Sequence, residues 1–114
     1  MNGVLISLIL CLQQDKPKPD AANEKYGSHE RHVIDLWKAP SDKPTPLVIF
    51  IHGGGFQGGS KDQVNANLIR RCLEKGISVA SINYRLTDSA PFPAAMHDGG
   101  RAVQYLRHKA KDFN

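Results

Sequence analysis

The sequence has little cysteine and no long apolar segment, and these two absences narrow the classes of protein to which the chain can belong. Its 114 residues include only two cysteines, Cys11 and Cys72, which are too few for a disulfide framework and lack the spacing of a zinc site. No apolar run approaches the roughly 18 residues of a membrane-spanning helix. Fifteen Lys and Arg stand against eleven Asp and Glu, but the basic residues are scattered, so no nucleic-acid or anionic-membrane partner is implied.

The composition is that of one small globular domain. Hydrophobic residues make up 40% of the chain and charged residues 23%, a balance that excludes a disordered tail. A length of 114 residues allows one domain. Because composition assigns no activity, the function has to be inferred from motifs.

The N-terminus carries an apolar run, Val4–Leu12, of the length expected for the core of a signal peptide. We therefore predict a signal peptide at 1–14, a polar linker at 15–23, and a secreted or periplasmic location. No Lys or Arg precedes the run and no small-x-small cleavage site follows it, which leaves a buried strand or helix as the alternative. A lipoprotein is less favoured, because Leu10 is large where a small residue should precede the lipid-bearing Cys11.

Residues 24–114 alternate between strand and helix signals. Two short strands are predicted within 24–38, the second at His32–Trp37, and the continuously apolar Leu47–Ile51 predicts a strand covered on both faces. Ser60–Gln63 has the form of a capping box that opens an amphipathic helix. The predicted buried face of this helix consists of Val64, Leu68 and Cys72, and Gly76 is its predicted C-terminal cap.

A further buried strand and a second helix complete this pattern. The strand is predicted at Ile77–Ile82, and one face of the helix carries Ala95, Gly99, Ala102, Val103, Leu106 and Ala110. The order is strand, strand, strand, helix, strand, helix. It predicts an α/β fold, with a mostly parallel sheet between helices and an antiparallel strand pair at one edge.

The glycine-rich segment after Leu47–Ile51 allows two interpretations. Gly53, Gly55 and Gly58 formally satisfy the dinucleotide-binding pattern G-x-G-x-x-G. That pattern needs an acidic residue at the end of the next strand to hold the ribose, and Asn83 and Tyr84 stand there instead. The second interpretation is an oxyanion hole, in which backbone amides freed by glycine stabilise the alkoxide of acyl transfer.

Two motifs carry a resemblance to a known family. The segment 48–56, ending in His-Gly-Gly-Gly-Phe, resembles the oxyanion segment of α/β-hydrolases in the hormone-sensitive-lipase-like and bacterial carboxylesterase group, which includes feruloyl and acetyl-xylan esterases. The Tyr-Arg-Leu of 84–86, the Pro-Phe-Pro-Ala of 91–94 and Asp98 resemble the block that follows the next strand in that group. The two motifs occur in the family's order, one strand–helix unit apart, and the resemblance covers about 26–114.

The resemblance implies roles for individual residues. Gly54 and Gly55 would donate the oxyanion amides, Gly53 would shape the turn, and His52 would hold the loop backbone. Phe56 would line the substrate pocket or pack under the loop. Structural roles are expected for three residues after the next strand: Tyr84 in packing, and Arg85 and Asp98 as an ion pair between the loop and the following helix.

The remaining histidines carry no predicted chemistry. His29 and His32 lie in a turn-rich segment with poor geometry for a metal, so both are expected at the surface, as are His97 and His108 on the second helix. No metal site and no cofactor are expected, since serine-based acyl transfer needs neither.

The resemblance also implies a nucleophilic serine in Gly-x-Ser-x-Gly, an acid and a distal histidine. None of the seven serines stands in that pattern; Ser60, the nearest to it, fails at the last position. In the family's order the nucleophile follows a strand that would begin near Asn114. We therefore expect an N-terminal fragment of an esterase or lipase acting on small-molecule or polysaccharide-linked carboxylic esters, inactive by itself. A prolyl-oligopeptidase-like peptidase, an arylformamidase and a non-catalytic binding module remain alternatives.

Overall fold

The computed structural model describes residues 16–113, so the predicted signal peptide and Cys11 lie outside the described residues. The strands are β1 (Ala21–Lys25), β2 (Val33–Trp37), β3 (Leu47–Ile51) and β4 (Ser78–Ile82). The helical elements are a short 3-10 helix η1 (Lys61–Gln63), α2 (Ala66–Glu74), α3 (Ala94–His108) and α4 (Ala110–Phe113). The predicted order of strands and helices is confirmed, with η1 and α4 as additions. Within 16–113, no helix has the length and apolar character needed to cross a membrane.

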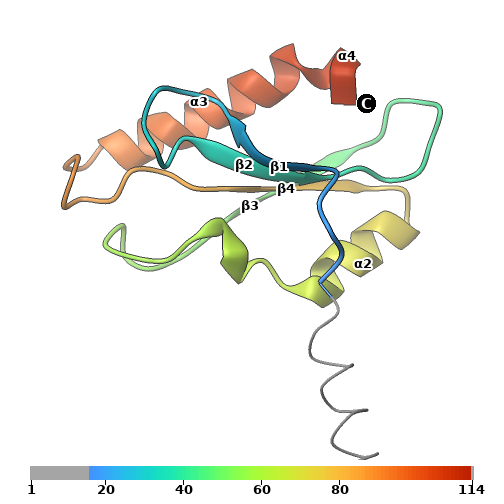
Figure 1. Ribbon diagram of the computed structural model, residues 1–114, viewed down its shortest axis with the longest axis horizontal. Coiled ribbons are helices and arrows are strands. Elements are labelled where there is room, and N and C mark those ends of the chain that lie inside the picture. The colour runs from blue at the N-terminus through green and yellow to red at the C-terminus, as the bar shows by residue number, and fades with distance from the viewer. Residues whose placement is uncertain (1–15, 114) are drawn as a thin grey trace, which may run out of the picture.

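The strands form one sheet in the order β1-β2-β4-β3. β1 pairs antiparallel with β2 at one edge, as predicted. β2 also runs antiparallel to β4, whereas β3 and β4 are parallel. The described sheet is therefore mixed, with less parallel pairing than the sequence suggested. α3 covers one face and α2 the other, which confirms the α/β architecture (Figure 1).

Alternating side chains of the two central strands fill a core on each face of the sheet. Toward α3, Ile34 of β2 and Ile82 of β4 pack with Leu106. Toward α2, Trp37 and Val79 belong to the other core cluster, which comprises Trp37, Val64, Ile69, Cys72 and Val79. All residues of β2 and β4 are buried, as expected for strands covered by a helix on both sides.

The first strand begins inside the stretch that the sequence marked as a polar linker. Ala21–Asn23 belong to β1, and the preceding residues also contact β2: the Asp20 amide donates to Leu36 O, and the Trp37 indole donates to Pro17 O. These contacts use backbone groups and one ring nitrogen, which a search for apolar alternation does not detect.

The capping box exists but caps a different element from the one predicted. Ser60 and Gln63 make both of its reciprocal hydrogen bonds around η1. The backbone is extended at Val64 and Asn65, and Asn65 caps α2 anew. This break rotates the helix, so that Ile69 and Cys72 are buried while Leu68, predicted on the buried face, is exposed. At the other end Gly76 occupies the predicted cap position, where its amide donates to Leu73 O and the Ile77 amide donates to Cys72 O.

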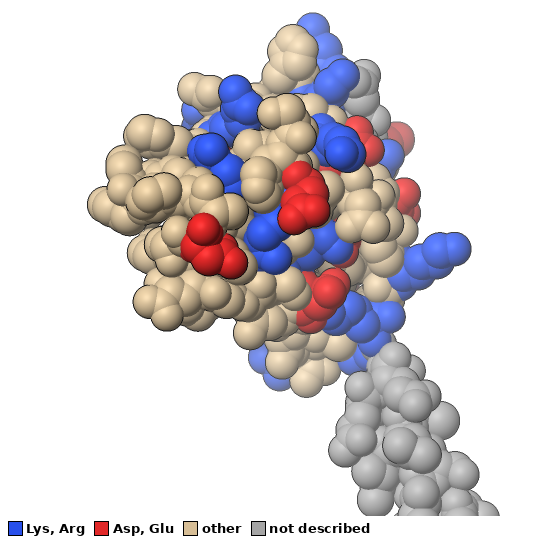
Figure 2. Space-filling model, turned by 60° about the vertical axis from the view of Figure 1, so that its left-hand side comes forward, with Lys and Arg blue, Asp and Glu red and all other residues tan. Residues whose placement is uncertain are grey.

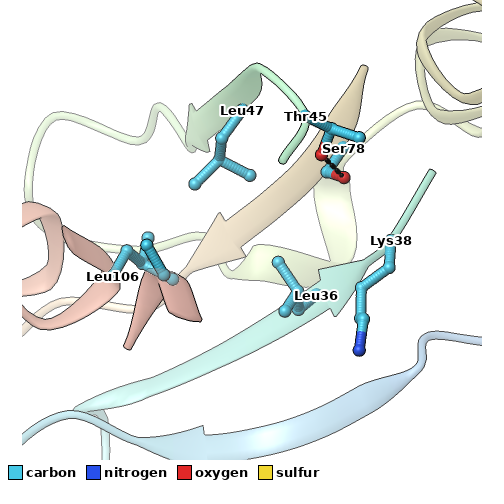
Figure 3. Close-up of a pocket in the computed structure, with 7 residues that line it drawn as sticks. Leu36, Lys38, Thr45, Leu47, Ser78 and Leu106 are labelled. Carbon is cyan, nitrogen blue, oxygen red and sulfur yellow. Dashed lines mark hydrogen bonds between the residues drawn. The ribbon is translucent and has the colours of Figure 1, made fainter. Parts of the chain in front are cut away.

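The third strand is not covered on both faces within the described residues. β3 lies at the edge of the sheet opposite β1, and Leu47, Val48 and Ile51 are each more than a third exposed. A hollow beside this edge is lined by Leu36, Lys38, Thr45, Leu47, Ser78, Leu106 and Ala110. Figure 3 shows its leucine side chains, which come from β2, β3 and α3, around a common space.

Candidate active site

The glycine loop, residues 52–59, connects β3 to η1 and has an unusual backbone. The φ angle is 128° at Gly54, 62° at Gly55, 62° at Phe56 and 93° at Gly59. At Gly54 only glycine fits, because a Cβ there would clash with the carbonyl oxygen of Gly58. A positive φ at a non-glycine residue such as Phe56 is a local strain of the kind that gathers at functional sites.

The amides of Gly54 and Gly55 are available to a ligand. Both residues are exposed, and neither amide donates a hydrogen bond to another residue of the described range 16–113. The loop is closed across them by the Gln57 amide, which donates to Gly54 O at 3.0 Å. The loop therefore presents two adjacent unpaired donors of the type that stabilises an oxyanion.

His52 lies at the start of the loop and is only 3% exposed. Its Nδ1 is 2.8 Å from Gly53 O, and its ring stacks on the Tyr84 ring with centroids 4.2 Å apart. The Tyr84 hydroxyl donates to His52 O at 2.7 Å. Burial lowers the pKa of His52, and the Arg31 charge lowers it further, against an opposing hydrogen bond with Gly53 O. A neutral, enclosed ring bound to its own loop backbone has no free nitrogen to act as a general base.

A buried ion pair that could not be predicted from the motifs anchors η1, which directly follows the C-terminal end of the loop. Lys61 Nζ lies 2.9 Å from Asp35 Oδ2 in β2, and both residues are less than a tenth exposed. The Lys61 amide also donates to Asn83 Oδ1 at 2.7 Å, and its carbonyl accepts from the Ser81 hydroxyl. Asp35 stands among apolar residues in β2, and this pattern could have indicated a buried carboxylate that requires a charged or hydrogen-bonding partner.

Arg85 and Asp98 form an ion pair between the segment after β4 and helix α3. The guanidinium binds the carboxylate through Nε and Nη2, with Nη2 2.9 Å from Oδ1, and the Arg85 amide donates to Oδ2. Burial alone would raise the pKa of Asp98, but hydrogen bonds from Arg85 and the close approach of His32 outweigh burial and hold that pKa below its usual range. The pair therefore fixes α3 to the segment that follows β4, at the residue next to Tyr84.

The prediction that His32 lies at the surface is wrong. His32 is 4% exposed, and its Nε2 lies 3.0 Å from Asp98 Oδ1. The His29 amide donates to its Nδ1, which leaves the ring proton on Nε2, facing the carboxylate. The sequence could not show this contact because Asp98 is distant in the chain. His97 and His108 are exposed, as predicted.

Phe56 lies against aromatic neighbours at the edge of a hollow. Its ring meets the Tyr84 ring edge-on at 6.0 Å and the Phe92 ring at 5.9 Å. The hollow is lined by Ile51, Phe56, Tyr84, Ala95, Met96, Gly99, Gly100 and Val103. Of the two expected placements, lining a pocket describes Phe56 better than packing under the loop, since it is 36% exposed.

Other chemistry is not visible in the described part of the chain. Residues 16–113 contain no cluster of His, Cys, Asp and Glu that could hold a metal ion, and Cys72 is a buried free thiol, as predicted. On the face in Figure 2, Lys and Arg alternate with Asp and Glu and form no continuous basic patch.

Comparisons with known proteins point to ester hydrolases. The chain is 40% identical over 68 residues to the carboxylic ester hydrolase LipN of Mycobacterium tuberculosis, covering 60% of this chain and 18% of LipN. It is 36% identical over 89 residues to the gibberellin receptor GID1 of rice (Oryza sativa), covering 75% of this chain and 25% of the receptor. A solved truncated carbohydrate esterase from gut microbiota superposes with a TM-score of 0.74 at 25% identity, covering 88% of this chain and 37% of that one.

The chain spans about a fifth to a quarter of the length of these curated relatives. A protein-family model, BD-FAE, matches residues 34–114, which is more than two thirds of the chain and includes the whole glycine loop. The chain belongs to the BD-FAE family of α/β-hydrolase esterases.

Proposed function

We propose that the glycine loop is the oxyanion hole of a carboxylic ester hydrolase. Gly54 and Gly55 donate their amides to the developing alkoxide, Gly53 shapes the turn, and His52 holds the loop in place. Phe56 borders the site where the acyl or alcohol part of the substrate binds. The observation that carries the proposal is the pair of exposed, unpaired amides in a loop of successive positive φ angles.

Donors that are already in position need no rearrangement when the transition state forms. One such donor contributes roughly 3–4 kcal/mol, or about a hundred- to a thousandfold in kcat. The anchoring of both loop ends, by the His52–Tyr84 stack and by the Lys61–Asp35 pair, supports this preorganisation. The adjacent hollow behind Phe56 is mainly apolar, which suits an ester better than a charged substrate.

The substrates we propose are small-molecule or polysaccharide-linked carboxylic esters. The likeness to a carbohydrate esterase favours the polysaccharide-linked class. The apolar run at Val4–Leu12 supports an exported enzyme, which cell fractionation with an antibody to the chain would test. No cofactor is required for this chemistry.

A second candidate function is binding without catalysis. The similarity to a gibberellin receptor supports it. Under either candidate function, we propose that a polypeptide of these 114 residues alone has no turnover, because none of its serines stands in Gly-x-Ser-x-Gly.

Sequencing the source DNA on both sides of this segment separates the two candidates. The hydrolase proposal predicts an open frame that contains Gly-x-Ser-x-Gly after Asn114, followed by an acidic residue and a histidine. An open frame in which another residue replaces that serine would refute the hydrolase proposal and support a binding module.

A further inference from the structure

One arginine outside both family motifs contacts the two ends of the glycine loop. Arg31 lies in the turn between β1 and β2 and is partly buried. Its Nη2 donates to Gly59 O at 2.9 Å and lies 3.4 Å from His52 Nε2. Its Nε donates to Tyr84 O at 2.8 Å. A single guanidinium therefore joins the first residue of the loop, the last residue of the loop, and the tyrosine that stacks on His52.

The chemistry of these partners fixes the proton on the His52 ring. A carbonyl oxygen only accepts, so the contact between His52 Nδ1 and Gly53 O requires a proton on Nδ1. A guanidinium only donates, so Nε2 must present its lone pair to Arg31. A second proton on Nε2 would face the donor and its positive charge. The titratable side chains that contact the ring are Arg31, from the β1–β2 turn, and Tyr84, after β4.

We infer that Arg31 is a positioning residue of the glycine loop, which joins the two ends of the loop and holds His52 in the neutral Nδ1–H form. In that form the ring binds Gly53 O and keeps the backbone before Gly54 in place. Lysine cannot substitute, because an ammonium group provides a point charge and not a planar fork that reaches several acceptors at once. The catalytic consequence of this inference rests on the proposed function, but the state of the ring does not.

Nitrogen NMR of the histidine rings in the full 114-residue chain tests the inference without an activity assay. The His52 signals are assigned by their loss in His52→Asn. In the unmodified chain we expect a protonated Nδ1 and an unprotonated Nε2 at neutral pH. In Arg31→Met the midpoint of the His52 titration moves to higher pH and a proton appears on Nε2.

Two further variants complete this design. Arg31→Lys keeps the charge and the apolar stem, so it protects folding, and it shifts the titration in the same direction by less. Arg71→Met is the matched control, since Arg71 is an exposed arginine of α2 and should leave the His52 ring unchanged. The inference is overturned if both Arg31 variants titrate as the unmodified chain does.

Kinetics on the polypeptide of the complete reading frame separate this inference from the proposed function. If that polypeptide hydrolyses esters, Arg31→Met should lower kcat about tenfold or more while changing KM little. The reason is that displaced oxyanion donors stabilise the transition state less well. If the ring responds as expected and no form of the protein hydrolyses esters, the proposed function fails and the positioning role stands. If esters are hydrolysed and neither ring nor kcat changes, the positioning role fails.

Discussion

Two adjacent glycines at the end of the glycine loop should respond in opposite ways to the same substitution. Gly59 has a φ of 93°, and a Cβ on it would lie 2.6 Å from His52 Nδ1, 2.7 Å from Gln63 Oε1 and closer still to Gly53 O. Gly58 has nothing within 4 Å of its ideal Cβ position, and its φ is not positive. Gly59→Ala therefore adds a methyl group where neighbouring atoms already fill the space, and Gly58→Ala adds the same group where the space is open.

The expected cost at Gly59 has two parts. A positive φ costs an alanine roughly 1–2 kcal/mol, and the clash adds a further penalty because two of the three nearest atoms, Gly53 O and His52 Nδ1, cannot move cheaply. Gly53 O belongs to the loop backbone, and the His52 ring is held by Tyr84 and Arg31. Together, these two costs should lower the free energy of unfolding of Gly59→Ala by about 2–4 kcal/mol relative to the unmodified chain. Gly58→Ala should lie within about 1 kcal/mol, with a small gain from reduced unfolded-state entropy.

Urea unfolding monitored by far-ultraviolet circular dichroism measures both variants against the unmodified chain. The midpoint should fall clearly for Gly59→Ala, while the slope stays the same and the midpoint of Gly58→Ala stays close to that of the unmodified chain. Equal midpoints for the two variants would refute the description of the loop as tightly closed at Gly59.

Three further predictions follow from buried charged and titratable groups. Lys61→Met leaves Asp35 buried without its partner and should cost about 3–5 kcal/mol in urea unfolding, whereas the double variant with Asp35→Leu should recover most of that loss; no recovery would argue against the pair. Because the pKa of Asp98 is lower in the folded chain than in the unfolded chain, acid protonates this carboxylate in the unfolded chain first. The stabilisation that the Asp98 carboxylate provides is therefore complete above about pH 4 and lost in stronger acid. Asp98→Asn should therefore flatten stability against pH in that acid range, and an unchanged profile would contradict the ion pair with Arg85. The lowered pKa of His52 likewise predicts that stability falls as pH drops below about 6.5, a slope that His52→Asn should reduce in the same unfolding assay.

Much of the fold could be predicted because local patterns determine it. The predicted strands at Leu47–Ile51 and Ile77–Ile82 form β3 and β4, and the cap at Gly76 ends α2 where predicted. What local patterns could not supply was the direction in which β2 pairs with β4. They also placed the helix start at Ser60, because a capping box has the same sequence whether a 3-10 turn or an α-helix follows it.

The glycine loop and the ion pair of Arg85 with Asp98 could be predicted from motifs, whereas the contacts of Arg31 and His32 could not. His52 and the glycines are adjacent in the chain, so one motif contains them. Arg31 and His32 reach this region from a turn before β2, across a distance in sequence that no motif spans. Their contacts depend on how β2 aligns with β4, and this alignment becomes known only when the sheet is assembled.

Ester hydrolysis by the polypeptide of the complete reading frame that contains these residues is the most direct test of the central claim, that the glycine loop is an oxyanion hole. With p-nitrophenyl acetate as substrate, we predict hydrolysis that Gly54→Ala lowers about a hundredfold in kcat and that the exposed control Arg71→Met leaves unchanged. Gly54→Ala is the sharpest change because its Cβ would clash with Gly58 O and force the proposed donor amides out of place. Equal kcat values for Gly54→Ala and the unmodified enzyme would contradict the account.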